Sequence, residues 1–493
     1  MKLLRINPSD HVAVALTPLT SRESITVDSL NIVIQEPINA GHKVAVLSIK
    51  SGDSVLKYGH SIGHATSDVA VGQLVHTHNL KTGLDGVSEY SYKPNRNSLE
   101  KREPDMFLGY RRPNGKVGIR NEVWIVPTVG CVNSTAANLQ RIAQPLIPKE
   151  VEGLYTFPHP YGCSQMSEDH ENTCRALAGL INHPNAAAVL VLGLGCENNS
   201  VEEMMKFLGD YDKERIHFLV TQDCADEYES GLTALSELLN YAAKFERENI
   251  SMSELIVGLK CGASDGFSGI TANPLVGSFS DQLVAQGGSV ILTEVPEMFG
   301  AETILMSRCR TPELFNSTVR MINDFKNYYI ENGQNIYENP SPGNKAGGIS
   351  TLEDKSLGCI QKGGTSDVVD VLNYGEPVKT KGLNLLTGPG NDLVSASAMT
   401  ASGAHLVLFT TGRGTPFGAP VPTVKISSNT AIYEKKSAWI DFNAGFLTEG
   451  MSLEDLSSEF YNYIRALVSG DILAKNELHN AREFTIFKTG VTL

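Results

Sequence analysis

The feature that most constrains the fold is a continuous apolar run, 188–194, which is followed directly by the polar tail 195–199. A run of this length, rich in Val and Leu, is typical of a strand buried on both faces of a parallel sheet. Open α/β sheets bind ligands beyond the carboxyl ends of their strands, which places Cys196 in the tail where chemistry is expected. Two more Gly-Cys pairs, at Cys131 and Cys163, follow two more strand-like runs. We therefore expect three Gly-Cys pairs to converge at the ends of three strands.

Length, charge and cysteine content limit the class of protein. A chain of 493 residues exceeds what one core supports, so two to four domains are expected. The net charge of −14 is spread along the chain, which argues against nucleic acid or anionic lipid as a partner. The sequence contains no run of about 20 apolar residues, so no membrane helix is expected, and the first residues do not resemble a signal peptide. We expect a cytoplasmic protein whose 8 cysteines are thiols or metal ligands.

The chain divides into four parts. Residues 1–80 consist of short β-prone pieces and predict a small all-β module, and residues 81–106 form a polar, turn-rich linker. In 107–248 strands and helices alternate, which predicts an α/β domain with a parallel sheet, and 249–493 continues in the same style with longer loops. For residues 107–248 we expect strands near 122–129, 152–157, 187–194 and 215–221, and helices near 133–145, 168–182, 200–209 and 225–247. For residues 249–493 we expect strands at 255–261, 289–293, 383–386, 405–409 and 423–426. The predicted fold class is multidomain α/β.

Two groups of side chains suit metal binding. Alternation along a strand would place His76 and His78 on one face, where they either bind a metal or carboxylate or are exposed polar residues. Cys131, Cys163 and Cys196 are separated by 32 and 33 residues, which is not zinc-finger spacing. Three thiolates could bind iron or an iron–sulfur cluster with an open coordination position.

Other roles for the cysteines remain open. One of the three Gly-Cys thiols could instead be a nucleophile with His159 or His170 as its base. Cys174 and Cys309 lie in helical stretches and are expected to be buried as small apolar residues.

Four dense polar loops mark apparent strand ends in the last part of the chain: 261–274, 293–302, 341–348 and 410–416. Glycines there let backbone N–H groups approach an anion, and the guanidinium of Arg413 suits bidentate capture of a carboxylate or phosphate. None of the loops has P-loop or G-x-G-x-x-G spacing, so a nicotinamide cofactor is not expected.

Nine stretches resemble one known family along essentially the whole chain. These are Lys57-Tyr-Gly with Ile62-Gly, 127–133, 161–165, 193–199, 264–274, 294–302, 339–348, 388–392 and 411–418. On these residues the sequence resembles the altronate and galactarate dehydratase family. His76-Thr-His-Asn, Cys359 and the C-terminal stretch 487–493 are similar to the altronate branch.

The resemblance implies a fold and an activity. It implies an N-terminal β-clip (SAF-like) module, a second domain associated with dimerisation, and a Rossmann-like C-terminal domain, and hence a homodimer. It also implies a hydro-lyase that uses iron (Fe²⁺, with Mn²⁺ or an iron–sulfur cluster as alternatives). The reaction would convert D-altronate to 2-dehydro-3-deoxy-D-gluconate in hexuronate breakdown. The alternatives are dehydration of galactarate or another sugar acid, a metal-free thiol lyase, and a sugar-acid-binding protein without catalysis.

Dehydration of a 2,3-dihydroxy acid removes the proton next to the carboxylate and expels the 3-hydroxyl, so charge must be stabilised at both places. Our hypothesis is that iron bound by some of Cys131, Cys163 and Cys196 acts as a Lewis acid on the carboxylate or the leaving hydroxyl. Lys345 would be the base, with His170 as the alternative base or as the acid. The substrate would be oriented by Ser268, Thr271, Asn273, Asn344 and Arg413, with His76 and His78 contributed by a lid.

Overall fold

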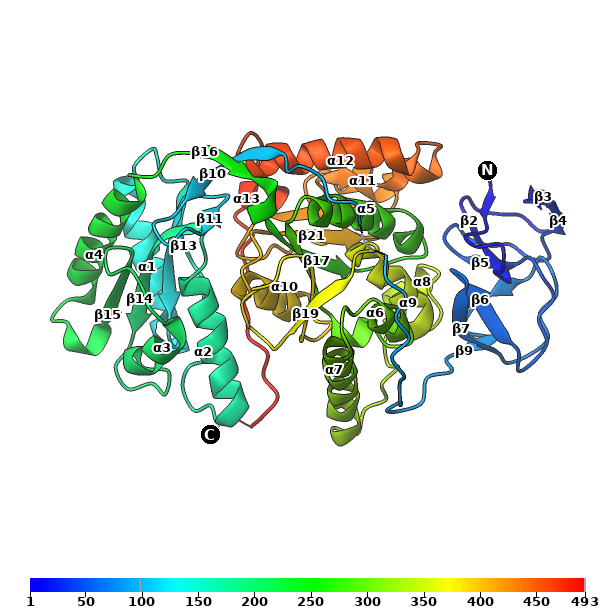
Figure 1. Cartoon of the computed structure of the whole chain (residues 1–493), viewed down its shortest axis with the longest axis horizontal. Coiled ribbons are helices and arrows are strands. Elements are labelled where there is room, and N and C mark those ends of the chain that lie inside the picture. Colours follow the sequence, from blue (N-terminus) through cyan, green and yellow to red (C-terminus); the bar gives the residue numbers. More distant parts are fainter. Residues whose placement is uncertain (98, 492–493) are drawn as a thin grey trace.

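The N-terminal module is built only from short strands. The structure is a computed structural model that describes residues 1–97 and 99–491 (Figure 1). Residue 98 in the predicted linker, and the last two residues of the 487–493 motif, lie outside this part. One antiparallel sheet has the order β1-β2-β5-β8, β3 pairs with β4, and β6-β7-β9 form a third sheet. The bounds are β1 Leu3–Leu4, β2 Val12–Ala15, β3 Ser24–Val27, β4 Leu30–Val33, β5 Lys43–Ala45, β6 Ser54–Lys57, β7 His60–Ala65, β8 Leu74–Val75 and β9 Leu80–Lys81. The expected small all-β module is confirmed.

The prediction that strand alternation places His76 and His78 on one face is wrong. β8 ends at Val75, and both histidines lie in the turn that leads to β9. The turn is fixed by Asn79, whose side chain accepts a hydrogen bond from the backbone N–H of His76 (2.9 Å) and donates one to the Leu74 carbonyl (2.9 Å).

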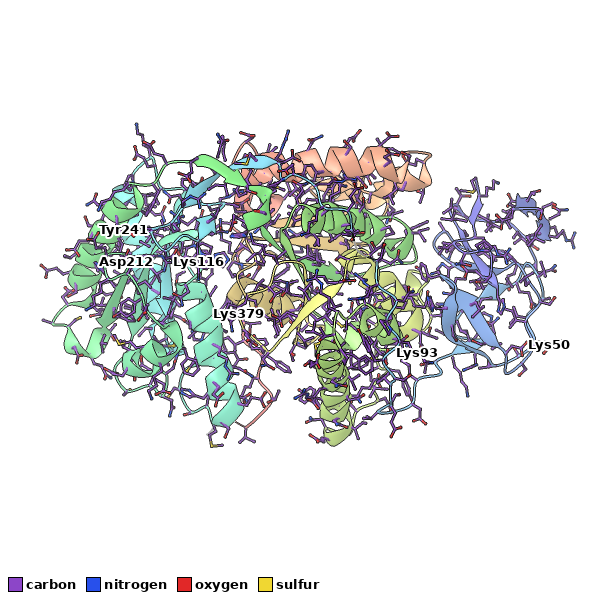
Figure 2. All side chains as sticks on the ribbon, in the orientation of Figure 1. Lys50, Lys93, Lys116, Asp212, Tyr241 and Lys379 are labelled. Carbon is purple, nitrogen blue, oxygen red and sulfur yellow. The ribbon has the colours of Figure 1, made fainter. Side chains whose placement is uncertain are left out.

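The second domain contains a four-stranded parallel sheet of order β13-β12-β14-β15. Its elements are β12 Glu122–Pro127, α1 Asn133–Ala143, β13 Gly153–Thr156, α2 Ser167–Ile181, β14 Ala186–Gly193, α3 Val201–Leu208, β15 Ile216–Val220 and α4 Glu227–Ala242. Every residue of β14 is buried, as the apolar run predicted, because α2 and α4 contact the sheet as well as the neighbouring strands. The hydroxyl of Tyr241 near the end of α4 donates to Asp212 before β15 (2.7 Å; Figure 2). All four expected strands and helices are present.

The C-terminal domain contains a seven-stranded parallel sheet of order β19-β20-β18-β17-β21-β22-β23. The strands are β17 Ile256–Gly262, β18 Ser289–Leu292, β19 Val368–Leu372, β20 Leu383–Leu386, β21 Leu406–Thr411, β22 Thr423–Ser427 and β23 Phe442–Asn443. The helices are α5 Ala272–Ala285, α6 Glu302–Ser307, α7 Pro312–Glu331, α8 Pro342–Ala346, α9 Leu352–Cys359, α10 Asp392–Ala401, α11 Thr430–Lys435, α12 Leu453–Val468 and α13 Lys475–Leu478. The edge strands β19 and β23 were not predicted, since one contains an aspartate and the other has two residues.

The second and C-terminal domains are closely joined. β10 (Met106–Arg111) pairs antiparallel with β16 (Glu248–Ser251) and with β11 (Val117–Gly118), so both ends of the second domain share one small sheet. α2 packs on α10 with Gly179 against the Ala401 backbone, where an added Cβ would lie 2.3 Å from the carbonyl oxygen. The C-terminal segment returns beside α2, and the Thr489 N–H donates to Asp169 (2.7 Å; Figure 1). Within the described residues, no helix is long and apolar enough to cross a membrane.

Candidate active site

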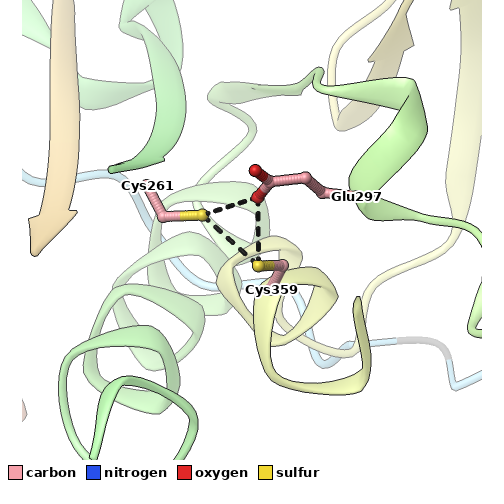
Figure 3. A group of neighbouring side chains, drawn as sticks. All are labelled: Cys261, Glu297 and Cys359. Carbon is pink, nitrogen blue, oxygen red and sulfur yellow. Dashed lines mark hydrogen bonds between the residues drawn. The ribbon is translucent and has the colours of Figure 1, made fainter. Parts of the chain in front are cut away.

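Three potential metal ligands meet at the carboxyl edge of the C-terminal sheet. Cys261 lies at the end of β17, Glu297 in the short 3₁₀ turn after β18, and Cys359 at the end of α9 (Figure 3). The Glu297 Oε2 atom lies 3.1 Å from the Cys261 Sγ and 3.2 Å from the Cys359 Sγ, and the two sulfurs are 3.3 Å apart. All three residues are buried. They form what we call the Cys-Glu-Cys cluster.

Buried lysines surround this cluster. Lys362 Nζ donates to the Cys261 Sγ (3.0 Å), and Lys355 Nζ donates to the second oxygen of Glu297 (2.7 Å). Lys260 forms an ion pair with Glu294 and a second with Asp392 (2.9 Å). The negative charge of the cluster is therefore compensated inside the protein, as a buried charged group requires.

The lysines explain the protonation of the acidic groups. Burial alone would raise the pKa of Glu297, but the charges of Lys355, Lys260 and Lys362 hold this pKa well below its usual range. The hydrogen bond from Cys359, followed by the charge of Lys362, lowers the pKa of Cys261 to about 6. The hydrogen bond with Cys261 raises the pKa of the Cys359 thiol, and burial and the negative charge of Cys261 act in the same direction. Cys261 is therefore a thiolate near neutral pH.

Two members of the cluster, Cys261 and Glu297, form part of the wall of a polar cavity of about 480 Å³. The wall also includes Lys355 and Asp392, and the remaining lining is provided by Gly262, Ala263, Glu338, Asn339, Ser341, Asn344, Gly390 and Asn391. The volume and the many amide and hydroxyl groups suit a small polyhydroxylated acid.

A second cavity of about 540 Å³ lies between the second and C-terminal domains. It is at the amino ends of β17 and β21, next to Ile256 and His405, and so at the opposite edge of the sheet from the Cys-Glu-Cys cluster. Its lining contains no cysteine, and its position does not favour catalysis.

The N-terminal module docks on α9, the helix that ends in Cys359. Lys43 and Lys57 of the module reach Asp354 of α9, at 2.8 and 2.9 Å from its two carboxylate oxygens. Thr82 of the module donates to Glu353, the preceding residue of α9. Burial alone would raise the pKa of Asp354, but the charges of the two lysines hold it well below its usual range. The module therefore fixes the helix that positions one of the two cluster thiols.

The Gly-Cys thiols lie in the second domain and do not contribute to the Cys-Glu-Cys cluster. Cys131, Cys163 and Cys196 are exposed and follow β12, β13 and β14. In the part of the chain that the structure describes, the one group of three possible metal ligands with atoms within 4.8 Å of one another is the Cys-Glu-Cys cluster. The structure therefore does not bring the three Gly-Cys sulfurs close enough together to surround one iron ion, although they follow three neighbouring strands.

The proposed base and acid are not brought to the cavity wall. Lys345 is only half-buried on α8, so it is not the fully buried lysine that we expected, whereas Asn344 of α8 and the preceding Ser341 do line the cavity. His170 lies on α2 of the second domain, with its Nε2 3.6 Å from the Cys174 Sγ. Arg413 is exposed after β21 and packs against Gly343.

The predicted substrate-orienting residues divide into two groups. Ser268 and Thr271 are buried and engaged locally, with Asp265 and with the Phe267 and Ser428 carbonyls. Asn273 donates to the Gly358 carbonyl (2.9 Å), immediately before Cys359. Asn344 lines the cavity. The structure thus gives Asn344 access to a ligand and gives Asn273 a role in positioning Cys359.

Of the two predicted lid histidines, one lies in the interface between the module and the C-terminal domain. The Nδ1 of His76 is 2.9 Å from the Ser350 Oγ, and its ring packs edge-on against His42. His78 is exposed. Neither ring lines the cavity.

Sequence reasoning missed the residues that form the cluster. Glu297 and Cys261 were both within loops identified as polar strand ends, but the Gly-Cys pattern directed attention elsewhere because Cys261 precedes its glycine. Cys359 and Lys355 lie on a helix, where no local pattern indicates a ligand.

The donor set fits a divalent transition metal. Two cysteine sulfurs and one carboxylate oxygen are an appropriate set for ferrous iron or zinc, and one of the thiols is already ionised near neutral pH. The residues that would bind the metal are Cys261, Glu297 and Cys359.

The fold and the site together define an α/β enzyme that acts on a small polar acid. Models of three families match successive parts of the chain. Residues 1–83 match the altronate/galactarate dehydratase SAF domain, 109–243 the D-galactarate dehydratase/altronate hydrolase second domain, and 252–492 the D-galactarate/altronate dehydratase C-terminal domain. The chain belongs to the altronate/galactarate dehydratase family.

Known proteins are similar to this chain over its whole length. The chain is 53% identical to an altronate dehydratase of Bacillus subtilis over 99% of both chains, and 50% identical to an altronate dehydratase of Escherichia coli over 100% of both. It is 30% identical to a galactarate dehydratase (L-threo-forming) of Escherichia coli, over 95% of this chain and 92% of that protein. The similarity is therefore much greater to the altronate enzymes.

Proposed function

We propose that this protein catalyses the dehydration of D-altronate to 2-dehydro-3-deoxy-D-gluconate and water. The observation that supports this most is the Cys-Glu-Cys cluster at the wall of a polar cavity, in a chain that altronate dehydratases match end to end. The enzyme is a carbon–oxygen lyase of sugar-acid catabolism.

The reaction requires a positive charge for the substrate carboxylate. Loss of the C2 proton places a second negative charge next to that carboxylate, so a fixed cation must stabilise the intermediate. Lys355 lines the cavity, and although burial alone would lower its pKa, the charge of Glu297 raises it and keeps the ammonium protonated. We assign to Lys355 the binding of the substrate carboxylate.

The reaction also requires a base at C2. Asp392 lines the cavity, and its Oδ1 pairs with Lys260 (2.9 Å) while its Oδ2 lies near the Cα of Gly262, where an added Cβ would be 2.8 Å away. We assign proton abstraction to Asp392 Oδ2. The electron pair left at C2 in the charged intermediate then forms the C2–C3 double bond as the C3–O bond breaks. The departing hydroxide takes up a proton and leaves as water, Asp392 returns its proton to solvent, and the enol converts to the 2-keto acid.

Iron is the metal that we propose for the Cys-Glu-Cys cluster. When bound there it would supply a Lewis acid for the departing 3-hydroxyl. Lys362, which donates to the Cys261 Sγ, and Lys355, which donates to Glu297, orient two of the three ligands.

We also propose that the enzyme works as a homodimer in the cytoplasm. All 8 cysteines are free thiols, which is typical of a reducing compartment. The dimer rests on the family resemblance of the second domain, and sedimentation velocity on the purified enzyme would test it by showing the mass of two chains.

The experiment that tests the function is an anaerobic assay with altronate and galactarate, combined with metal analysis. We expect stoichiometric iron, a 2-keto acid product from altronate, and a lower kcat/KM for galactarate. Faster turnover of galactarate would establish the alternative substrate. Saturable altronate binding without keto product in the iron-loaded protein would contradict catalysis altogether.

A separate measurement distinguishes the two candidate bases. Exchange of the altronate C2 hydrogen with deuterated solvent should be lost in Asp392→Asn and retained in Lys345→Ala. The opposite result would assign the base to Lys345, as the sequence alone predicted.

A further inference from the structure

The loops that contain the three Gly-Cys pairs pack directly on their neighbours. A Cβ at Gly130 would lie 3.0 Å from the His159 carbonyl oxygen, and one at Gly162 only 2.1 Å from the Thr128 carbonyl oxygen. A Cβ at Gly195 would lie 2.7 Å from the Oε1 of Gln222. Glycine precedes each cysteine because another loop occupies the place of a side chain.

Hydrogen bonds join these loops into one edge of the second-domain sheet. The Gly130 N–H donates to the Tyr161 carbonyl (2.9 Å), which links the loop after β12 to the loop after β13. The Asn199 N–H donates to the Gly162 carbonyl (3.0 Å), and the Ser164 N–H donates to the Asn198 side chain (2.7 Å), which link the loops after β13 and β14. The three strands are also adjacent in the sheet order β13-β12-β14. The cysteines that follow these glycines are therefore held on one surface.

The three thiols differ from the other second-domain cysteines in their surroundings. Cys174 donates to Asn199 Oδ1 (3.1 Å) and Cys224 to the Val220 carbonyl (3.3 Å), so both have partners. Cys131, Cys163 and Cys196 are exposed, and the contacts found for the last two are at 3.8 Å. Their sulfurs are available to an external ligand.

The surroundings of the thiols limit the kind of ligand. Among the described residues the three sulfurs do not form a group within 4.8 Å, as the atoms of the Cys-Glu-Cys cluster do, so a ligand that contacts all three must be larger than one ion. An iron–sulfur cluster binds its thiolates farther apart because several iron atoms lie between them, and cluster sulfurs accept hydrogen bonds from nearby N–H groups. Gln165, two residues after Cys163, is 5% exposed, and its Nε2 has no hydrogen-bond partner among the described residues.

We propose that Cys131, Cys163 and Cys196 bind an iron–sulfur cluster at the carboxyl edge of the second-domain sheet, with one iron lacking a protein thiolate. This site is separate from the Cys-Glu-Cys cluster of the C-terminal domain and does not depend on the function proposed for that cluster. Three thiolates leave one position open to water or a small ligand.

The test is anaerobic reconstitution of the full-length protein with ferrous iron and sulfide, read out by iron and acid-labile sulfide content and by Mössbauer spectra. We expect equal amounts of bound iron and sulfide in addition to any mononuclear iron. The triple variant Cys131→Ser/Cys163→Ser/Cys196→Ser should lose the sulfide completely, and circular dichroism should show an unchanged fold since all three residues are exposed.

Two control variants make the assignment specific. Cys224→Ser, at the next strand end, should retain the sulfide because that thiol already donates to a carbonyl. Cys261→Ser/Cys359→Ser should also retain it while losing mononuclear iron. The proposal would be overturned if the reconstituted wild-type protein contained no sulfide. It would also be overturned if the triple variant retained sulfide, or if the Cys224→Ser control lost it.

Discussion

At the scale of single residues, three buried lysines determine the charge of the active site. Lys260, Lys355 and Lys362 each contact an acidic group or thiolate of the site, and none is more than 8% exposed. An unpaired carboxylate in this environment would be costly, so each lysine contributes to both stability and catalysis.

The first prediction concerns Lys355. Lys355→Met should lower kcat/KM for altronate by about 100-fold or more, because the substrate carboxylate and Glu297 both lose their cation. It should also lower the free energy of unfolding by about 3 kcal/mol, since Glu297 remains buried and unpaired. Steady-state kinetics and urea unfolding measure the two effects.

Lys379→Met is the matched control for this substitution. Lys379 is exposed on the surface, and its one ion-pair partner among the described residues is Glu376 (3.4 Å; Figure 2). Its loss should change neither quantity measurably. An active, equally stable Lys355→Met enzyme would remove Lys355 from the mechanism.

The sequence showed which loops are rich in polar residues, but it did not show which of those residues form the site. The polar loops that contain Glu297 and Asn344 were identified because glycines and donors are dense there. The Cys-Glu-Cys cluster could not be derived, since 98 residues separate its two cysteines and only the fold brings them to 3.3 Å. Lys345 was chosen as the base because it lies in a glycine-rich loop, whereas Lys355 was not considered, because its burial beside Glu297 depends on the tertiary fold.

At the scale of elements, α9 connects the N-terminal module to the cluster. Its first residues contact the module and its last residue is the ligand Cys359. His76 of the module approaches Ser350, just before the helix. Burial, with the nearby charges of Lys43 and His42, lowers the pKa of His76 to about 4.

The second prediction is a pH dependence of this docking. A histidine with a lower pKa in the folded protein binds fewer protons there than in the unfolded chain between pH 4 and about 6.5. The contribution of neutral His76 to the free energy of unfolding is therefore full above pH 6.5, and it is lost as the pH falls toward 4. Because His76 is only half-buried, solvent reduces the effect to about 1–2 kcal/mol.

Hydrogen exchange of residues 350–359 at pH 4.5 and 7 measures this effect. Exchange should be faster relative to the intrinsic rate at pH 4.5 in the wild type, and this difference should decrease in His76→Gln. His78→Gln should behave as the wild type, because His78 is exposed. Identical pH dependence in all three proteins would exclude His76 as the titrating group.

Elements were predicted far better than contacts between them. The strands of both parallel sheets that lie in the interior were derived from apolar runs, since burial on two faces leaves a clear signal. The docking of the module on α9 leaves no periodic signal, because it depends on two lysines and one aspartate that are about 300 residues apart.

At the scale of the whole molecule, the module and the C-terminal domain share one core. Buried residues of the module, among them Val12 and Ile62, belong to the same apolar cluster as Leu357 of α9 and Phe299 after β18. Figure 1 shows the module at one end of the molecule, beside α8 and α9. We therefore expect these two parts to unfold together.

The third prediction tests this coupling through Asp354. Asp354→Ala leaves Lys43 and Lys57 buried without their partner, and should lower the free energy of unfolding by about 3–5 kcal/mol. Calorimetry should then show the module unfolding before the rest of the chain. Asp68→Ala removes two exposed interactions, the ion pair with Lys50 (2.8 Å) and a hydrogen bond from the Ser51 N–H (2.9 Å), and should leave the transition nearly unchanged. Lys50 is labelled in Figure 2. A single unshifted transition in Asp354→Ala would contradict the coupling.

The most direct test of the active site is the kcat/KM of Glu297→Gln for altronate, measured anaerobically with ferrous iron. Glu297 contacts both cluster thiols and Lys355, and the substitution preserves its shape. We predict a loss of about 1,000-fold with the protein still folded, as expected when a site loses a central charged group. A kcat/KM within a few-fold of the wild type would show that altronate is dehydrated elsewhere in the molecule.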